Sequence, residues 1–205
     1  MKQLLVATRS RGKQREFTEL LAPLGATIVF PDDLGILESD AEVDLECFDT
    51  FEANARAKAE WFATRVGMPT LADDSGLEVA TLNGAPGVLS KRFAGMAGPE
   101  ELVAGANNAR LLEMLAGLPP KRRTARYRCA LVLVRSDGDP EIITGGAVAG
   151  RILDAPRGAG GFGYDPLFLS DELGITFAEA TSAEKARVSH RARAAAALIE
   201  RLQRS

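Results

Sequence analysis

The residues Gln3–Leu24, QLLVATRSRGKQREFTELLAPL, decide the fold class of this chain. They begin with the short apolar run Gln3–Ala7, which is typical of a buried strand, and polar residues follow it directly. From Glu16 to Leu24 apolar residues recur at helical spacing, at Phe17, Leu20, Leu21 and Leu24. A buried strand, a polar loop and an amphipathic helix in succession predict an α/β fold.

Three further segments predict helices. Asp49–Glu52 resembles a capping box, and the helix behind it carries one apolar face with Phe51, Ala55, Ala59, Phe62 and Val66, while Asn54 and Lys58 share another. Pro99–Leu115 is helical in pattern and is ended by Pro119-Pro120. A second capping box, Thr181–Glu184, opens the C-terminal helix, whose predicted buried stripe comprises Val188, Ala192, Ala195, Ile199 and Leu202.

The remaining patterns predict strands. Pro69–Ala72 is a short apolar strand that ends at Asp73 and Asp74, and Leu77–Ala80 forms a second strand that pairs nearby. Alternating residues over Arg126–Leu133, the turn Ser136–Asp139 and the segment Glu141–Val148 predict a hairpin. No repeat, low-complexity tract or linker divides the sequence, so residues 1–205 are treated as a single domain.

Composition excludes several classes of protein. A hydrophobic content of 46% over 205 residues supports a large folded core, and a net charge of -3 argues against binding along a nucleic-acid backbone. Two cysteines without a C-x-x-C motif and a single histidine exclude a standard zinc site and fit a reducing cytoplasm. Leu4–Ala7 is too short for the apolar region of a signal peptide, and no apolar stretch approaches membrane-spanning length.

The loop Thr8–Lys13 is the first candidate ligand site. It lies between the first strand and the first helix, where open α/β folds hold anions on the N–H groups of a helix N-terminus, and Lys13 adds a positive charge. It is not a P-loop, because Thr8 stands where the motif has its first Gly and Gln14 follows the lysine. Taken alone, the loop is equally compatible with a solvated basic turn.

The pair Asp73-Asp74 is the second candidate. Adjacent strand residues face opposite ways, so at most one of the two carboxylates points into a given cleft. Carboxylates suit Mg²⁺, which is usually shared with substrate phosphates, whereas an Asx-turn is the structural alternative.

The glycine-rich stretch Arg157–Pro166, RGAGGFGYDP, fits the pattern G-x-G-x-x-G. A dinucleotide site needs a strand before the glycines and a helix after them, and both flanks lack these elements, since Pro166 opposes a following helix. We therefore expect a loop in which glycines admit a ligand close to the backbone. Lys185, Ser189, His190 and Arg191 collect donors near the last helix, a pattern that by itself is typical of a solvated face.

Together these stretches resemble the inosine triphosphate pyrophosphatase family. The resemblance runs the length of the chain and covers, in order, Thr8–Lys13, Thr50–Ala59, Ala72–Val79, Gly84–Val88, Arg92–Gly95, Asn107-Asn108, Gly161–Phe168, Glu184-Lys185 and Ser189–Arg191. Each piece is modest, and their order and spacing are specific.

The resemblance implies an elongated mixed sheet flanked by helices, two lobes around a substrate cleft, a relation to the Maf fold, and a homodimer. It implies Mg²⁺-dependent hydrolysis of inosine, deoxyinosine and xanthosine triphosphates to the monophosphate and pyrophosphate. Asp74 would be the general base and a metal ligand, Glu46 a second metal ligand, and Ser75 a substrate contact. Further substrate contacts would be Thr8, Arg9, Ser10, Arg11, Gly12 and Lys13 for the phosphates, and Phe162, Gly163, Tyr164, Asp165, Lys185, His190 and Arg191 around the base.

This chain departs from the family pattern at three places. Ser10 replaces an Asn, Glu46-Cys47-Phe48 replaces Glu-Thr-Gly, and Ala192 replaces a Gly. A hydroxyl at position 10 lacks the reach and the two-ended hydrogen bonding of an amide. Two alternatives stay open: a Maf-like pyrophosphatase for modified pyrimidine nucleotides, and a nucleotide sensor that binds without hydrolysis.

Overall fold

The computed structural model describes residues 2–135 and 139–204, so most of the predicted turn Ser136–Asp139 lies outside the described residues. Within the described residues, six strands form one sheet in the order β2-β1-β3-β4-β5-β6. They are β1 (Gln3–Val6), β2 (Thr27–Val29), β3 (Thr70–Val79), β4 (Thr124–Val134), β5 (Ile142–Ile152) and β6 (Phe168–Ser170). β1 is parallel to β2 and β3, and β5 is antiparallel to β6, which confirms the predicted mixed sheet.

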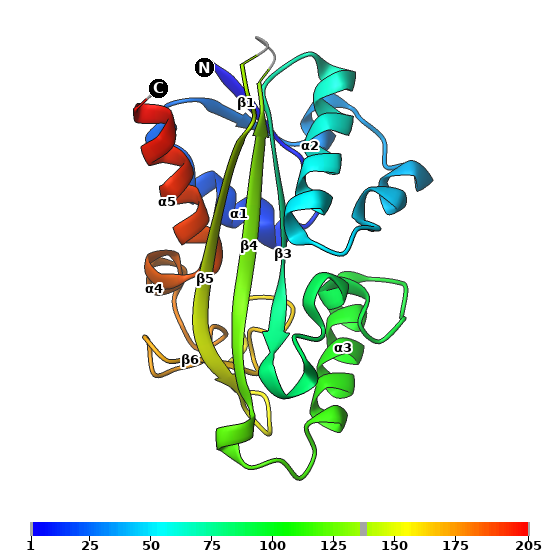
Figure 1. The fold of residues 1–205 in the computed structure, drawn as a ribbon, viewed down its shortest axis with the longest axis vertical. Helices are drawn as coiled ribbons and strands as arrows, with labels where there is room; N and C mark the ends of the chain where they lie inside the picture. Colours follow the sequence, from blue (N-terminus) through cyan, green and yellow to red (C-terminus); the bar gives the residue numbers. More distant parts are fainter. Residues whose placement is uncertain (1, 136–138, 205) are drawn as a thin grey trace. The chain divides into compact units, whose positions relative to one another are not determined.

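Five α-helices flank the strands in the described part of the chain (Figure 1). They are α1 (Arg11–Leu20), α2 (Phe51–Val66), α3 (Glu100–Met114), α4 (Ser182–Val188) and α5 (His190–Gln203). Short 3-10 helices occupy the connections: Ala22–Leu24, Pro31–Leu34, Asp40–Glu46, Ala80–Leu82, Gly87–Arg92 and Pro120–Arg122.

The described chain divides into two compact units. Unit 1 comprises Met1–Asp74, Cys129–Gly146 and Arg191–Ser205, and unit 2 comprises Ser75–Arg128 and Ala147–His190.

Unit 1 is a three-layer α/β/α arrangement. Phe17 and Leu21 of α1 and Leu198 of α5 pack on one face of its strands, against residues such as Leu4 and Leu131. On the other face α2 packs Ala55, Ala59 and Phe62 against β1, β2, β3 and β4 (Figure 1). Each fully buried Leu or Phe in these layers contributes roughly 1.5–3 kcal/mol by leaving water.

Unit 2 has one apolar core. Leu111 and Leu115 of α3, Tyr127 of β4, Val148 of β5 and Phe168 of β6 belong to it. Arg123 is buried at its margin, where the guanidinium donates to the carbonyl oxygens of Leu115, Ile152 and Leu153. The same core also includes Leu77, Val79, Ala125, Ile152, Tyr164, Leu167 and Phe177.

The predicted elements are largely confirmed, with three corrections. Asp73 and Asp74 do not end a strand, because β3 continues without a break from Thr70 to Val79 and absorbs the predicted second strand. The N-cap of α2 is Thr50, whose side chain accepts from the N–H of Ala53, so the predicted Asp49–Glu52 capping box is wrong. The last helix is split at Ser189 into α4 and α5, although the Thr181–Glu184 capping box is present as predicted.

Candidate active site

The loop after β1 leads into α1 in the manner that an anion site requires. Thr8 is buried, Ser10 is the N-cap of α1, and Arg11, Gly12 and Lys13 form the first helical turn. That turn contains no acidic residue of its own, so the positive end of the helix dipole is not neutralised from within the helix.

Lys13 is held by Asp73. Its Nζ lies 2.9 Å from Asp73 Oδ2, and its side chain remains 18% exposed while that of Asp73 is 1% exposed. Asp73 Oδ2 also lies 3.5 Å from a guanidinium nitrogen of Arg191, which in turn is paired with Glu16. Burial favours the neutral form of Asp73, but the charges of Lys13, Arg191 and Lys58 outweigh it and hold its pKa below the ordinary value.

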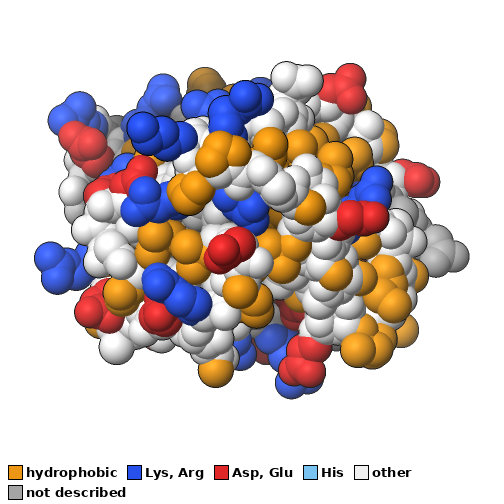
Figure 2. Space-filling model, turned by 90° about the horizontal axis from the view of Figure 1, so that it is seen from below, with side chains coloured by type: hydrophobic (Ala, Val, Ile, Leu, Met, Phe, Trp, Pro, Cys, Tyr) orange, Lys and Arg blue, Asp and Glu red, His pale blue; other side chains and the backbone are white. Residues whose placement is uncertain are grey.

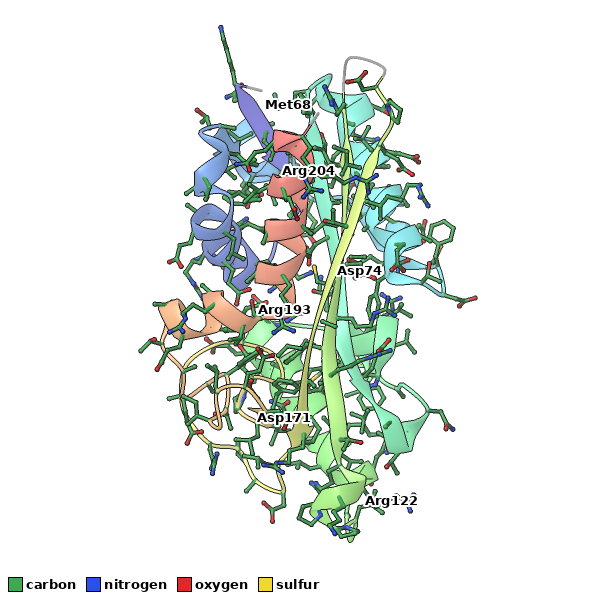
Figure 3. All side chains as sticks on the ribbon, turned by 60° about the vertical axis from the view of Figure 1, so that its left-hand side comes forward. Met68, Asp74, Arg122, Asp171, Arg193 and Arg204 are labelled. Atoms are coloured by element: carbon green, nitrogen blue, oxygen red, sulfur yellow. The ribbon has the colours of Figure 1, made fainter. Side chains whose placement is uncertain are left out.

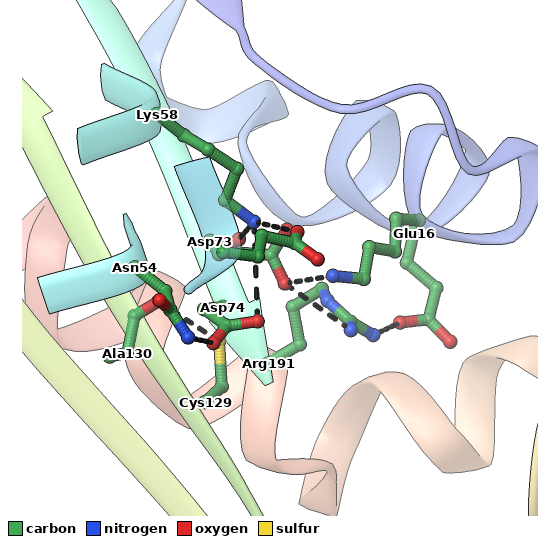
Figure 4. Close-up of polar contacts among 10 residues, drawn as sticks. Glu16, Asn54, Lys58, Asp73, Asp74, Cys129, Ala130 and Arg191 are labelled. Carbon is green, nitrogen blue, oxygen red and sulfur yellow. Dashed lines mark hydrogen bonds and ion pairs between the residues drawn. The ribbon is translucent and has the colours of Figure 1, made fainter. Parts of the chain in front are cut away.

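Asp74 faces a different set of partners, as the alternation of strand residues predicts (Figure 4). Asn54 Nδ2 donates to Asp74 Oδ2 at 2.8 Å, and Lys58 Nζ lies 4.0 Å from Asp74 Oδ1. Burial raises the pKa of Asp74, and Glu46 adds to this, against the opposing charges of Lys58 and Lys13. A buried carboxylate with a raised pKa is a stronger base than a solvated one.

Lys58 joins Asp74 to Glu46. The Lys58 ammonium donates to Glu46 Oε1 at 2.7 Å and to the carbonyl oxygen of Asp73 at 2.5 Å. Burial alone would lower the pKa of Lys58, but Glu46, Asp74 and Asp73 together raise it above the ordinary value. Lys58 is therefore a permanent cation between two carboxylates.

We call these seven ionisable residues the charged cluster: Glu16, Lys13, Glu46, Lys58, Asp73, Asp74 and Arg191. Figure 3 labels Asp74, and Figure 4 labels Glu16, Lys58, Asp73, Asp74 and Arg191 in close-up. All belong to unit 1. They comprise three cations and four carboxylates, so full ionisation leaves one negative charge in excess.

The carboxylates Asp74 and Glu46 fit a divalent cation. Both lie beside one positive centre, the Lys58 ammonium, and carboxylate oxygen is the ligand that Mg²⁺ prefers. The excess negative charge and the raised pKa of Asp74 would both be relieved by an added cation. Within residues 2–135 and 139–204, no three His, Cys, Asp or Glu side chains gather into a group that could hold a metal ion.

The glycine-rich stretch is a loop with no helix after it, which confirms that it is not a dinucleotide fingerprint. Asp165 organises it, because its carboxylate accepts from the N–H of Phe162 at 2.9 Å and pairs with Lys185 at 2.5 Å. Gly161 is required there, since its φ is +70° and an added Cβ would lie 2.2 Å from Asp165 Oδ2.

The aromatic residues of this loop differ in their accessibility. Tyr164 is buried and donates from its hydroxyl to the carbonyl of Ser90 at 2.9 Å, whereas Phe162 is only half-buried. The Lys185 ammonium lies 4.8 Å from the centre of the Phe162 ring, and Asn108 donates to the carbonyl of Gly163. Phe162 therefore has the ring face that a planar ligand could stack on.

His190 is packed parallel to Tyr127, with ring centres 4.7 Å apart. It is 3% exposed, and it belongs to unit 2 with Phe162, Asp165 and Lys185. We call these four residues together with Tyr127 the aromatic cluster. Ser75, half-buried in β3, is the first residue of the same unit.

Two of the residues predicted to contact the substrate have acidic partners within the protein. Arg9 is bound to Asp32 at 2.5 Å and to Glu42 at 2.8 Å, and it lines a depression of about 300 Å³ with residues such as Ile36 and Leu37. Arg191 is 1% exposed and joins the charged cluster rather than the aromatic cluster.

Sequence reasoning missed Lys58, Asn54 and Glu16 as site residues. Asn54 and Lys58 are polar residues four positions apart in a helix whose neighbouring residues Ala55 and Ala59 are fully buried. That spacing was the available signal, because it places both side chains on one buried flank. Glu16 gives no such signal, because its partner Arg191 is 175 residues away.

The surface and the helices add two findings. On the face shown in Figure 2, Lys and Arg side chains are interspersed with hydrophobic and acidic ones. None of the helices in the described residues is both long enough and apolar enough to cross a membrane.

Comparison with known proteins places this fold and site in one class. The Ham1 family model matches residues 4–201. The dITP/XTP pyrophosphatase of Ralstonia nicotianae is 49% identical over 99% of this chain and 98% of its own length, and that of Thermus thermophilus is 46% identical over 97% and 90%.

Solved structures of Ham1 proteins have the same fold as this chain. A HAM1 protein from Coxiella burnetii has a TM-score of 0.84 at 33% identity and full coverage of both chains. A nucleoside-triphosphatase, dITP/XTP pyrophosphatase, from Mycobacterium abscessus has a TM-score of 0.72 at 40% identity, over 96% of this chain and 98% of its own. The chain belongs to the Ham1 family, and the predicted resemblance is confirmed.

Proposed function

We propose that this chain is a Mg²⁺-dependent nucleoside triphosphate pyrophosphatase that hydrolyses dITP, ITP and XTP to the monophosphate and pyrophosphate. The observation that carries the proposal is the placement of Asp74, a buried carboxylate of raised pKa set beside Lys58 and Glu46. The names of the relatives, dITP/XTP pyrophosphatase, supply the substrate class.

The triphosphate is assigned to the start of α1. N–H groups of its first turn, the hydroxyls of Thr8 and Ser10, and the partly exposed Lys13 are donors suited to phosphate oxygens. Asp73 holds Lys13 in place, because its Oδ2 contacts the Lys13 ammonium. Arg191 contacts the same oxygen.

Asp74 and Glu46 would hold Mg²⁺, which when bound supplies charge neutralisation to the phosphates. Asp74 accepts the proton of an attacking water, and the water adds to the α phosphorus in line with departing pyrophosphate. Lys58 keeps the two carboxylates charged and close, and Ser75 contacts the substrate next to Asp74. Most of the rate enhancement then comes from positioning and electrostatics.

The base is assigned to the aromatic cluster. Phe162 offers a stacking face, and Lys185, His190 and backbone N–H groups are donors suited to the carbonyl oxygen at C6 of hypoxanthine or xanthine. Adenine carries an amino donor there, and unmatched buried donors discriminate by about 10⁴-fold or more. We also propose that the protein acts in the cytoplasm as a homodimer, as the resemblance implies.

The test is a substrate panel in Mg²⁺, using inosine, deoxyinosine, xanthosine, adenosine, guanosine and thymidine triphosphates. We expect pyrophosphate and monophosphate from the first three. Release of single phosphates would contradict cleavage between the α and β phosphates, and a pyrimidine preference would favour the Maf-like activity. Tight binding without turnover would favour the sensor.

A further inference from the structure

We infer that Asn54 is a positioning residue that sets the carboxylate of Asp74 and the segment carrying Glu46 at a fixed separation. The inference rests on the proposed function, because it concerns how Asp74 and Glu46 act together. Asn54 is completely buried in the first turn of α2, behind the Thr50 cap. Its amide has one partner at each end.

The two ends of the amide bind two different segments. Asn54 Nδ2 donates to Asp74 Oδ2 at 2.8 Å, and Asn54 Oδ1 accepts from the N–H of Phe48 at 2.9 Å. A flipped amide would set an oxygen against a carboxylate and an amino group against an N–H donor. The partners therefore fix the orientation of this side chain.

On the Asp74 side the contact selects which oxygen is available. Asn54 engages Oδ2, so that Oδ1 is turned toward Lys58 at 4.0 Å (Figure 4). A carboxylate held at one oxygen cannot rotate freely about its last bond. Asp74 is thus held in one orientation relative to Lys58.

On the other side the contact holds the chain next to Glu46. Phe48 is two residues after Glu46, where the 3-10 helix Asp40–Glu46 ends. Phe48 is 46% exposed, and its N–H donates to the buried Asn54, so this bond and the Lys58–Glu46 pair both restrain the segment. One amide therefore links the two proposed metal ligands.

Lys58 lies one helical turn further along and contacts the same two carboxylates. Lys58 and Asn54 act on these carboxylates in different ways. Lys58 supplies charge, and Asn54 supplies direction through a neutral group that leaves the charge of the cluster unchanged.

Asn107 is a matched control. It is 4% exposed in α3, its Oδ1 accepts from the N–H of Ala94 at 2.8 Å, and its Nδ2 donates to the carbonyls of Ser90 and Lys91. It is a buried, two-ended amide with no carboxylate partner. Substituting Asn107 measures the cost of losing such an amide for structural reasons alone.

The experiment compares Asn54→Ala, Asn54→Asp and Asn107→Ala in the full chain. For each variant we would measure kcat and KM for dITP and the Mg²⁺ concentration that gives half the maximal rate. We would also measure Mn²⁺ binding without nucleotide and the temperature of thermal unfolding. For Asn54→Ala we expect kcat to fall by about 10–100-fold, the usual range for residues that orient metal ligands. The Mg²⁺ concentration for half-maximal rate and the dissociation constant for Mn²⁺ should rise by the same range. KM for dITP at saturating Mg²⁺ should change much less.

Asn54→Asp keeps an acceptor for Phe48 but sets a second carboxylate against Asp74, so it should lose kcat at least as far as the alanine variant and should also be less stable, because two buried like charges repel each other. Asn107→Ala should lower the unfolding temperature and leave the Mg²⁺ requirement unchanged. Wild-type kcat and metal binding in folded Asn54→Ala, or an equal metal shift in Asn107→Ala, would overturn the inference. A wild-type chain without dITP hydrolysis would instead refute the proposed function, and the Mn²⁺ comparison would still decide the role of Asn54.

Discussion

Each of the two units contains an Asp–Lys pair, and the two pairs differ in how exposed the lysine is. In unit 2 the Asp165–Lys185 pair is closed, because both side chains are under 10% exposed and the carboxylate is also bound by the N–H of Phe162. In unit 1 the partner of Asp73 is Lys13, whose side chain is 18% exposed at the start of α1. One pair shapes a loop, and the other keeps a cation available to a ligand.

The Asp165–Lys185 pair and the charged cluster also differ in their net charge. The Asp165–Lys185 pair is neutral, whereas the charged cluster has one carboxylate more than it has cations. Burying such an excess is costly unless a cation or a proton joins it. An added cation would therefore balance the charged cluster, whereas the Asp165–Lys185 pair is already balanced.

The largest effect is expected for Asp74→Asn. Removing the general base should lower kcat by about 10²–10⁴-fold, because proton transfer to a positioned base contributes that much. The fold should be kept, since burial already favours the neutral form of this side chain. Pyrophosphate release and circular dichroism measure the two outcomes, and near-normal turnover would refute the assignment.

The next effect separates the two pairs. Lys185→Met should destabilise the fold by about 3–5 kcal/mol, because it leaves a buried carboxylate unpaired, and adding Asp165→Asn should recover part of this loss. Urea unfolding measures both.

The counterpart in unit 1, Lys13→Met, should lower kcat/KM more and stability less than Lys185→Met does, since Lys13 is more exposed and Arg191 still pairs with Asp73. The reverse order of the two stability losses would remove the distinction between the pairs.

A smaller effect is expected for Phe162→Ala. Loss of a stacking face should weaken nucleotide binding by about 1–3 kcal/mol and raise KM while leaving kcat nearly unchanged. Phe162→Tyr keeps the ring and serves as the control. A fall in kcat without a change in KM would show that the ring does not bind the base.

The smallest effect is a pH dependence of opposite sign at adjacent residues. The folded-state pKa of Asp73 lies below its ordinary value of 3.8, so its contribution to stability is present above that value and is lost as pH falls. The folded-state pKa of Asp74 is raised, so its contribution is lost as pH rises through the raised pKa.

Urea unfolding of Asp73→Asn and Asp74→Asn against wild type over pH should show these two trends. For Asp73→Asn the difference from wild type should shrink below pH 3.8, the ordinary value. Parallel trends at the two positions would contradict the separate environments of the two carboxylates.

Much of the fold follows from local patterns in the sequence. The β1–α1 unit, α3, the β4–β5 neighbours and the Thr181 cap all rest on spacing within about 4–18 residues, which a single sequence displays. The opposite directions of Asp73 and Asp74 follow from strand geometry alone.

The errors come from contacts between distant residues. Ser75 and Gly76 interrupt the apolar pattern, so the continuous β3 was not predicted, yet the strand runs through both residues. Arg9 and Arg191 are basic residues beside ligand motifs, but their partners Asp32, Glu42 and Glu16 are 23, 33 and 175 residues away. Tertiary pairing at such separations leaves no periodic signal.

The composition of unit 1 from three chain segments has a consequence for its biosynthesis. Its core requires Ala194, Ala195 and Leu198 of α5, and its charged cluster requires Arg191. During translation the chain through Gly146 contains β1, α1, α2 and Asp74 but cannot close this core, because α5 is still in the ribosome. The part of this core that α5 covers therefore stays exposed until α5 has been made.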